Sequence, residues 1–238
     1  MDWWLPFEHR FDYTSDGLTR AYEDSTQRLG LNRIDLVLIH DLDFRHHADE
    51  ESVGGYLDQL SAGGGWRALE GLRAAGEIKG IGAGINELGM IPRFLERFDI
   101  DFFLVAMPYT LMDQAALETE FPLCAARGIG IVIGAPYASG ILATGPTDGA
   151  NYRYKLADPA ALEWANRLDR ICGRHGVPLR AAALQFALGH PSVAAVIPGV
   201  ISADQMDDNI AMVRAPIPAD LWAELKSEGL VRADAPTP

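Results

Sequence analysis

Short apolar runs alternate with amphipathic segments along this chain, and this alternation constrains its fold more than any other feature. Apolar runs of strand length occupy residues 34–39, 81–85, 102–107, 129–133 and 193–197. Such runs are typical of parallel strands that are buried on both faces. Helical spacing of apolar residues is found at 16–29, 66–75, 90–98, 113–127, 159–175, 178–188 and 202–213, and from 218 onward. This repetition predicts an α/β fold with a parallel sheet.

The glycines of the second predicted strand help to choose between an open sheet and a closed barrel. Gly80, Gly82 and Gly84 lie within a strand, whereas a nucleotide-binding open sheet has a G-x-G-x-x-G turn after its first strand. A (β/α)8 TIM barrel is therefore favoured, but it needs eight strands and only five are predicted. We expect a single domain over residues 1–238, corresponding to the C-terminal two-thirds of an N-terminally truncated barrel. Its open edges favour self-association.

Composition excludes several classes of partner. The formal net charge of −13 argues against a nucleic-acid partner, which would require a basic face. No apolar run approaches the roughly 20 residues that span a bilayer. Cys124 and Cys172 have neither metal-site spacing nor the pattern of a disulfide framework. We expect a protein of the reducing cytoplasm, without a membrane partner.

His40 is the first candidate for chemistry. It ends the apolar run 34–39, and a polar loop with Asp41, His46 and His47 follows. Barrel enzymes carry catalytic groups where strands open into loops. The alternative is a hydrogen-bonded histidine at a strand end with no catalytic role.

Motifs along nearly the whole chain show a family resemblance. They are FDY at 11–13, YEDS at 22–25, RLGL at 28–31, DLVLIHD at 35–41, ALEGLR at 68–73, GAGINE at 82–87, GAPYASGIL at 134–142, PLRAAALQF at 178–186 and IPG at 197–199. In this order they resemble the aldo-keto reductase family. The similarity is to its branch of D-threo-aldose 1-dehydrogenases, L-fucose and galactose dehydrogenases, and pyridoxal 4-dehydrogenases.

The resemblance implies hydride transfer between a nicotinamide cofactor and a small carbonyl compound or sugar. In the family a tyrosine exchanges the proton, a lysine and an aspartate support it, and a histidine orients the substrate oxygen. His40 matches that histidine, and a buried imidazole N–H would be a suitable donor to a developing oxyanion. The other three residues belong to units before residue 11, so we expect them to be absent. Asp12 and Tyr13 match a non-catalytic stretch of the family.

Cofactor positions are also implied by the resemblance. Asn86 matches an amide that holds the nicotinamide carboxamide, with a helix N-cap as the alternative. Ser139, Gly140 and Leu142 match the loop along the pyrophosphate, with a plain turn as the alternative. The turn at Gly199 leads into a segment that would receive the adenosine end, through Gln205 and Asn209. Residues 151–154 resemble a loop that lines the pocket.

Two further expectations concern the choice of cofactor and of metal. NADP-specific members of the family place a lysine near position 199 and an arginine at position 205, and both are absent here. Asp204, Asp207 and Asp208 would repel a 2′-phosphate, so NAD is favoured over NADP. His46 and His47 are expected in a solvated loop, and no metal is predicted.

Three functions compete. The first is an NAD-dependent oxidoreductase of aldo-keto reductase type acting on an aldose or a related aldehyde. The second is a non-catalytic incomplete barrel, or a pseudoenzyme that binds a nucleotide. The third is a scaffold that completes its sheet with another chain. For residues 1–238 alone we expect negligible dehydrogenase activity, because only His40 of the four catalytic residues is present.

Overall fold

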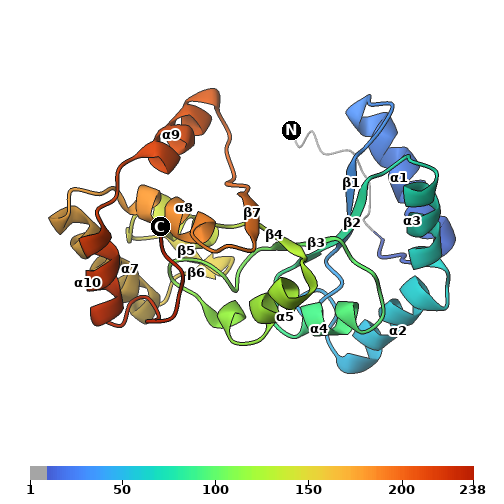
Figure 1. Ribbon diagram of the computed structural model, residues 1–238, viewed down its shortest axis with the longest axis horizontal. Helices are drawn as coiled ribbons and strands as arrows, with labels where there is room; N and C mark the ends of the chain where they lie inside the picture. The colour runs from blue at the N-terminus through green and yellow to red at the C-terminus, as the bar shows by residue number, and fades with distance from the viewer. Residues whose placement is uncertain (1–9) are drawn as a thin grey trace.

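Five parallel strands form the sheet that organises the protein. The computed structural model describes residues 10–238, and residues 1–9 of the predicted domain lie outside the described residues. The strand order is β1-β2-β3-β4-β7, and Figure 1 shows the sheet as an open arc with β1 and β7 at its ends. The strands are β1 (Leu36–His40), β2 (Gly80–Ile85), β3 (Phe102–Val105), β4 (Gly130–Ile133) and β7 (Val193–Val196). The predicted α/β fold of TIM-barrel type with about five strands is confirmed.

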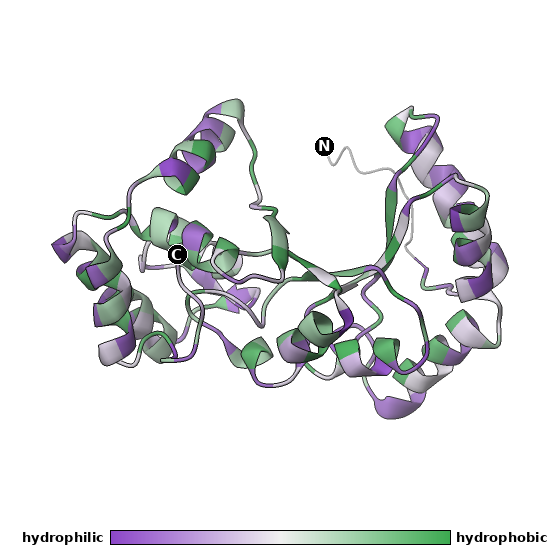
Figure 2. Ribbon diagram, in the orientation of Figure 1, coloured by the Kyte–Doolittle hydropathy of each residue, from purple (hydrophilic) through white to green (hydrophobic). Residues whose placement is uncertain are grey.

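Helices lie along the outer side of this arc (Figure 1). Their sequences are amphipathic, and Figure 2 shows hydrophilic and hydrophobic residues alternating on them while the strands are largely hydrophobic. None of the described helices is long and apolar enough for a membrane span. The helices are α1 (Ser15–Leu29), α2 (Glu50–Ser61), α3 (Gly65–Ala74), α4 (Met90–Leu95), α5 (Glu120–Arg127), α6 (Ile141–Thr144), α7 (Pro159–Arg174), α8 (Leu179–Leu188), α9 (Ala203–Arg214) and α10 (Ala219–Ser227).

Local signals explain where the main helices begin and end. Thr14 caps α1 by accepting a hydrogen bond from the backbone N–H of Gly17, and Gly30 ends the helix in the left-handed region at φ 64°. Asp158 caps α7, and Pro159 occupies its first turn. Ser202 caps α9. These termini agree with the predicted ones to within one or two residues.

Three predicted segments need correction. The polar loop expected after β1 contains α2, which Asp49 caps and which buries Val53, Leu57 and Leu60. The single helix expected at 113–127 is a 3-10 turn, η1 (Ala115–Leu117), followed by α5. Pro122 explains the division, because proline is tolerated in the first turn of α5 but would break a longer helix. The third is the loop expected at residues 151–154, which contains a hairpin of β5 (Asn151–Tyr152) and β6 (Lys155–Leu156).

Glycines on the inner face of β2 make room for side chains from both neighbouring strands. A Cβ atom at Gly80 would lie 2.9 Å from Leu36 Cδ2, and one at Gly82 would lie 2.9 Å from Leu38 Cδ2. The same Cβ at Gly82 would lie 2.7 Å from Phe102 Cζ. Real Cβ atoms do not approach other atoms so closely, so a side chain at either position would force its neighbours to shift. At Gly82 the neighbours include the backbone oxygen of Phe102, whereas at Gly80 the closest atom is the flexible end of Leu36. The side chains of Leu36 and Leu38 therefore extend from the edge strand β1 over the glycines of β2.

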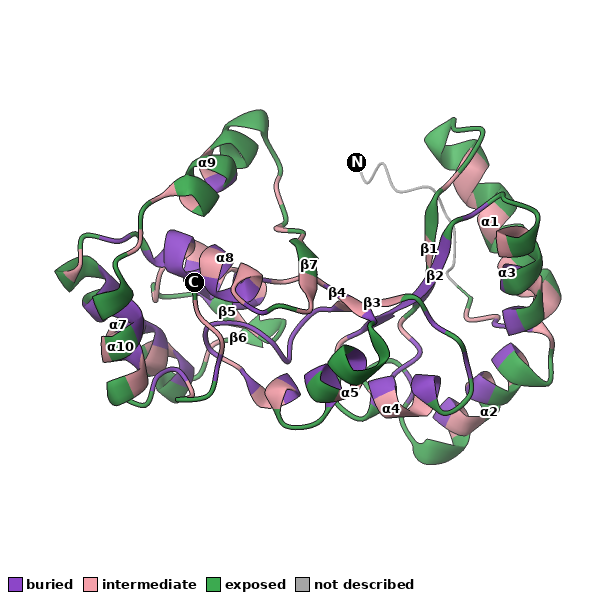
Figure 3. Ribbon diagram, viewed as in Figure 1, coloured by how far each residue is buried: buried purple, intermediate pink, exposed green. Residues whose placement is uncertain are grey.

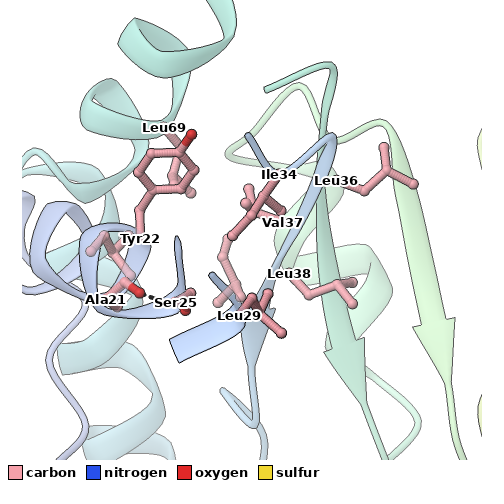
Figure 4. Close-up of a pocket in the computed structure, with 11 residues that line it drawn as sticks. Ala21, Tyr22, Ser25, Leu29, Ile34, Leu36, Val37, Leu38 and Leu69 are labelled. Atoms are coloured by element: carbon pink, nitrogen blue, oxygen red, sulfur yellow. Dashed lines mark hydrogen bonds between the residues drawn. The ribbon is translucent and has the colours of Figure 1, made fainter. Parts of the chain in front are cut away.

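Both ends of the described sheet expose apolar surface. On β1, 56% of Leu36 and 40% of Leu38 are exposed, and Figure 3 shows α1 and α9 largely exposed as well. A cavity of about 290 Å³ lies between α1 and β1. Figure 4 shows it lined by apolar side chains that include Tyr22, Leu29 and Val37. Self-association through these edges stays a prediction.

Gly82→Ala should destabilise the protein through overpacking. Besides the contacts with Phe102 Cζ and Leu38, the new Cβ would lie 2.8 Å from the backbone oxygen of Phe102, which is not free to rotate away. We expect a loss of about 1–3 kcal/mol in the free energy of unfolding, measured by urea denaturation. Gly84→Ala in the same strand is the control, because its Cβ would meet only Ile39 O at 3.9 Å. Equal losses in the two variants would contradict the packing argument.

A buried carboxyl group lies under α4. Glu120 is 2% exposed and accepts a hydrogen bond at 2.5 Å from the backbone N–H of Gly89, the N-cap residue of α4. Its second oxygen, Oε2, has no hydrogen-bond partner among the described residues. Burial raises the pKa of Glu120 to about 7, although backbone N–H groups of Gly89 and Ile91 oppose the shift.

This raised pKa makes stability depend on pH. The folded protein favours protonated Glu120, so the contribution is full below the unfolded pKa of about 4.5 and is lost as the pH rises towards 7. The loss amounts to about 3 kcal/mol at 1.36 kcal/mol per pKa unit. Glu120→Gln should flatten the dependence and be more stable than the wild type above pH 7, as measured by urea unfolding across this range. Glu96→Gln, on a side chain that is 70% exposed, should leave the pH profile unchanged.

Candidate active site at the carboxyl ends of the strands

A polar pocket of about 350 Å³ lies at the carboxyl ends of β1 to β4. Gly84 and Gly134 contribute backbone without side chains to its wall. A Cβ atom at Gly134 would lie 2.5 Å from Leu104 Cδ2, so a side chain there would displace the end of Leu104. The pocket is lined by His40, Asp41, Arg45, His46, Gly84, Ile85, Asn86, Leu104, Ala106, Gly134 and Tyr154.

His40 ends β1 as predicted, but its expected burial is wrong. Its side chain is 83% exposed, and Nε2 lies 3.2 Å from Asp41 Oδ2. His40 shares the inner face of β1 with Leu36 and Leu38, and β1 is an edge of the described sheet, so no further strand covers this face. The backbone carbonyl of His40 accepts a hydrogen bond from the hydroxyl of Tyr13 at 2.7 Å. Tyr13 therefore supports the strand end by its hydroxyl. It does not line this pocket but lines a second one that shares His40, Asp41 and His46.

Asp41 connects the polar groups around His40. Besides His40, it lies 3.1 Å from His46 Nε2 through Oδ2, and it accepts from Asn86 Nδ2 at 3.2 Å through Oδ1. Its backbone is in the left-handed region at φ 54°, which is uncommon for a residue other than glycine. Strain of this kind concentrates at functional sites, which makes this loop a candidate site.

Asp43 is the buried anchor of the same loop. It is 0% exposed and accepts hydrogen bonds from the backbone N–H groups of Arg45, His46 and Asn86 at 3.1, 3.3 and 3.0 Å. His46 Nδ1 and Asn86 Nδ2 contribute two more, at 2.8 and 3.3 Å. Burial by itself would raise the pKa of Asp43, but the bonds from His46 and Asn86 hold that pKa below its usual value.

Of the two histidines expected in a solvated loop, His46 is exposed and His47 is buried, so the expectation is wrong for His47. His47 is 5% exposed and contacts the rings of Phe11, Tyr13 and Tyr56, and burial lowers its pKa. The side chain of His46 is 26% exposed.

Ligand atoms of Asp41, Asp43 and His46 lie within 4.8 Å of one another, as a metal site would require. Each is engaged in the hydrogen bonds above, and the prediction of no metal stays a prediction.

Asn86 follows β2 and faces the same pocket as His40. The alternative of a helix N-cap is wrong, since the N-cap residue of α4 is Gly89. Its side chain is engaged at both ends, because Nδ2 donates to Asp41 and Asp43 while Oδ1 accepts from the Tyr154 hydroxyl at 3.1 Å. The structure therefore brings two of the predicted site residues into one pocket.

The loop predicted for the pyrophosphate has an unusual backbone. Ala138, Ser139 and Gly140 have φ values of 49°, 65° and 105°, a left-handed backbone that is uncommon for the two residues other than glycine. The choice between a pyrophosphate loop and a plain turn stays a prediction. Ser139 Oγ accepts from the backbone N–H of Tyr154 at 2.9 Å, which joins this loop to the pocket. Leu142 is fully buried in α6.

Residues predicted for the adenosine end lie around the start of α9. Gln205 Oε1 accepts from the backbone N–H of Ile201 at 2.9 Å, next to the turn that contains Gly199. Asn209 is buried, and its Oδ1 accepts from the Tyr137 hydroxyl at 2.5 Å. Asp208 is paired with Arg180, so its charge is compensated, which weakens one part of the argument against NADP.

Two pocket residues were not predicted individually. Tyr154 lies at the tip of the β5–β6 hairpin, and the Arg45 guanidinium lies over its ring at 4.2 Å from the centroid. The resemblance of residues 151–154 to a pocket loop was a signal for Tyr154. Arg45 had none, because its contact joins segments distant in the sequence.

Polar residues at the carboxyl ends of parallel β/α strands are the arrangement of TIM-barrel enzymes. The sequence profile of the Aldo/keto reductase family matches residues 5–228. The chain belongs to this family of oxidoreductases.

Two relatives give the scale of the similarity. The chain is 41% identical to a pyridoxal 4-dehydrogenase of Microbacterium luteolum over 227 residues, which is 95% of this chain and 66% of the relative. It is 35% identical to a D-threo-aldose 1-dehydrogenase of a Pseudomonas species over 229 residues, covering 96% and 65%. The chain therefore spans about two thirds of the length of these relatives.

Among solved structures, the holo form of an aldo-keto reductase from Bacillus halodurans superposes with a TM-score of 0.69 at 26% identity. The match covers 94% of this chain and 70% of that one. The resemblance inferred from the motifs is thus confirmed at the level of the family.

Asp43→Asn should destabilise the protein, because both oxygens of Asp43 accept hydrogen bonds from N–H groups. In the variant, the side-chain NH₂ group replaces one of these oxygens and points its own hydrogens at the same N–H donors. We expect a loss of about 3 kcal/mol in the free energy of unfolding, measured by urea denaturation at neutral pH. Because the pKa of Asp43 is lowered, its contribution is complete above the unfolded pKa of about 4 and is lost as the pH falls through the lower folded value. The variant should lack this loss.

Asp49→Asn is the matched control. Asp49 is exposed and caps α2 by accepting from Ser52 N at 2.8 Å, and asparagine caps equally well. A control variant as unstable as Asp43→Asn would contradict the assignment of Asp43 as the anchor.

Proposed function

We propose that this chain takes part in NAD-dependent hydride transfer of the aldo-keto reductase type. The substrate class is a small aldehyde or hemiacetal, as in a sugar or a pyridoxal-like compound. The observation that carries the proposal is the pocket that joins His40 and Asn86 at the carboxyl ends of the strands.

A reducing, cytoplasmic setting is supported by two free, buried thiols, those of Cys124 and Cys172, whose pKa values burial raises to about 12.

The pocket fits a planar nicotinamide ring. Gly84 and Gly134 leave backbone where side chains would otherwise fill the space. When bound, the cofactor supplies the hydride acceptor at this wall. Asn86 is assigned to the carboxamide, Ser139, Gly140 and Leu142 to the pyrophosphate, and Gly199, Gln205 and Asn209 to the adenosine end. His40 is assigned to orient the substrate oxygen, and its exposed imidazole is accessible to a substrate.

NAD is the proposed cofactor. Gln205 stands where an arginine would bind a 2′-phosphate. Asp204 and Asp207, exposed beside it at the start of α9, would repel the negative charge of a phosphate. The nearby Arg180 is paired with Asp208.

Isothermal titration should therefore give a lower Kd for NAD than for NADP, by about tenfold, which corresponds to 1.4 kcal/mol. Gln205→Arg should narrow this ratio, because the guanidinium adds a bidentate donor for phosphate. Gln27→Arg on the exposed side of α1 is the control and should leave the ratio unchanged. Tighter binding of NADP by the wild type would contradict the proposal.

The lining of the described pocket includes no lysine to pair with a tyrosine for proton exchange of the family's kind. The three lysines of the chain are Lys79, Lys155 and Lys226, and none of them lines the pocket. Burial raises the pKa of Tyr13, whose hydroxyl is bonded to the His40 carbonyl. This favours the second candidate function, nucleotide binding without turnover by residues 1–238 on their own.

Purified 1–238 should bind NAD and show no detectable turnover of pyridoxal or a threo-aldose, measured by NADH absorbance. The physical reason is that no lysine lines the pocket beside a tyrosine, so the tyrosine–lysine pair that the family uses for proton exchange is not formed there. Turnover that His40→Ala abolishes would overturn the non-catalytic assignment.

A further inference from the structure

The orientation of the Asn86 amide is determined by charge. Its Nδ2 group donates to Asp41 Oδ1 at 3.2 Å and to Asp43 Oδ2 at 3.3 Å. Carboxylates only accept, so a flipped amide would place its oxygen against two negatively charged groups. Both amide hydrogens are therefore committed, and Asn86 offers a ligand only its oxygen, Oδ1.

Tyr154 places a hydroxyl group at that oxygen. Its O–H donates to Asn86 Oδ1 at 3.1 Å, across 68 positions of the sequence. Arg153 and Tyr154 form the two-residue tip of the β5–β6 hairpin, with φ values of 50° and 62°, as a type I′ turn requires. Tyr154 is 48% exposed, so one side of it remains open to solvent.

Three contacts hold this hairpin tip over the pocket. The backbone N–H of Tyr154 donates to Ser139 Oγ at 2.9 Å, and Arg153 is paired with Asp113 at 2.5 Å. The guanidinium of Arg45 lies 4.2 Å from the centroid of the Tyr154 ring, a cation–π contact. The position of the hydroxyl is thus set by contacts of the hairpin tip with the segments after β1, β3 and β4.

We propose that Tyr154 and Asn86 together form a clamp for a primary carboxamide, the nicotinamide carboxamide of the cofactor. On binding, the Tyr154 hydroxyl exchanges its bond to Asn86 Oδ1 for one to the carboxamide oxygen, and the released Asn86 Oδ1 accepts from the carboxamide N–H. The tyrosine supplies a hydrogen-bond donor to the ligand, because the Asn86 NH₂ group already donates to Asp41 and Asp43. This assignment rests on the proposed binding of NAD and adds a specificity residue to it.

The charges around the clamp define what it rejects. Asp41 and Asp43 lie behind Asn86, so a nicotinate carboxylate in place of the carboxamide would meet like charge. A methyl ketone in place of the carboxamide keeps the acceptor oxygen but lacks the N–H group. Burial raises the pKa of Tyr154, which keeps its hydroxyl protonated and able to donate at neutral pH.

Calorimetry with three dinucleotides tests the clamp. The probes are NAD, its acetylpyridine analogue and its nicotinic acid analogue, titrated into wild type, Tyr154→Phe and Tyr152→Phe. Tyr152 is the control, because it lies on the same hairpin and lines a different pocket. For the wild type we expect NAD to bind about tenfold more tightly than the acetylpyridine analogue, and the nicotinic acid analogue to bind weakest.

Tyr154→Phe should weaken NAD and the acetylpyridine analogue by the same factor, about five- to tenfold, because both carry the carbonyl oxygen. Their ratio should stay unchanged, an outcome that general loosening of the pocket would not produce. Tyr152→Phe should bind all three as the wild type does.

The possible negative outcomes distinguish failure of the clamp from failure of the proposed NAD binding. NAD binding by Tyr154→Phe that equals or exceeds that of the wild type overturns the clamp and leaves NAD binding intact. Loss of the preference for NAD over the acetylpyridine analogue in this variant also overturns it. Failure of the wild type to bind any of the three overturns both.

Discussion

The loop after β1 depends on one buried carboxylate. Asp43 accepts five hydrogen bonds, which connect its own loop to the first residue beyond β2. A buried charge is costly unless it is satisfied in this way, so the loop and Asn86 are held in one arrangement. Asp41, His46 and the end of β1 take their positions from this connection. The candidate site is built on the ends of two adjacent strands, and its geometry is set by a residue that does not face the pocket.

The two ends of the pocket are supported differently. On the β1 side, Tyr13 bonds to the carbonyl of His40 and a cluster of aromatic rings surrounds His47. On the far side, the left-handed backbone from Ala138 to Gly140 receives the hairpin tip through Ser139. The imidazole of His40 is not packed against either support, since β1 is an edge of the described sheet. The His40 imidazole is therefore exposed, while Asp43 and His47 behind it are buried.

The sequence predicted the parallel sheet and the position of His40 and Asn86 at strand ends, because apolar runs stop at these residues. It did not predict α2, whose paired glycines Gly54 and Gly55 obscure the helical spacing. The orientation of Asn86 depends on Asp41 and Asp43, more than 40 positions away in the sequence, and its contact with Tyr154 spans still more. Periodicity and local motifs carry no information on such contacts. The exposure of His40 depends on the neighbours of β1, which local patterns also do not describe.

The glycines of β2 have a consequence for how this protein can change. The volume above Gly80 and Gly82 is filled by Leu36 and Leu38 from one side and by Phe102 from the other. At Gly82 the backbone oxygen of Phe102 also limits the space, so a larger residue there is best accommodated if a neighbouring strand loses atoms at the same level. Substitutions at Gly82 are therefore expected to be coupled to Leu38 and Phe102 on the two neighbouring strands. Variation in this wall of the barrel is expected to come in compensating pairs.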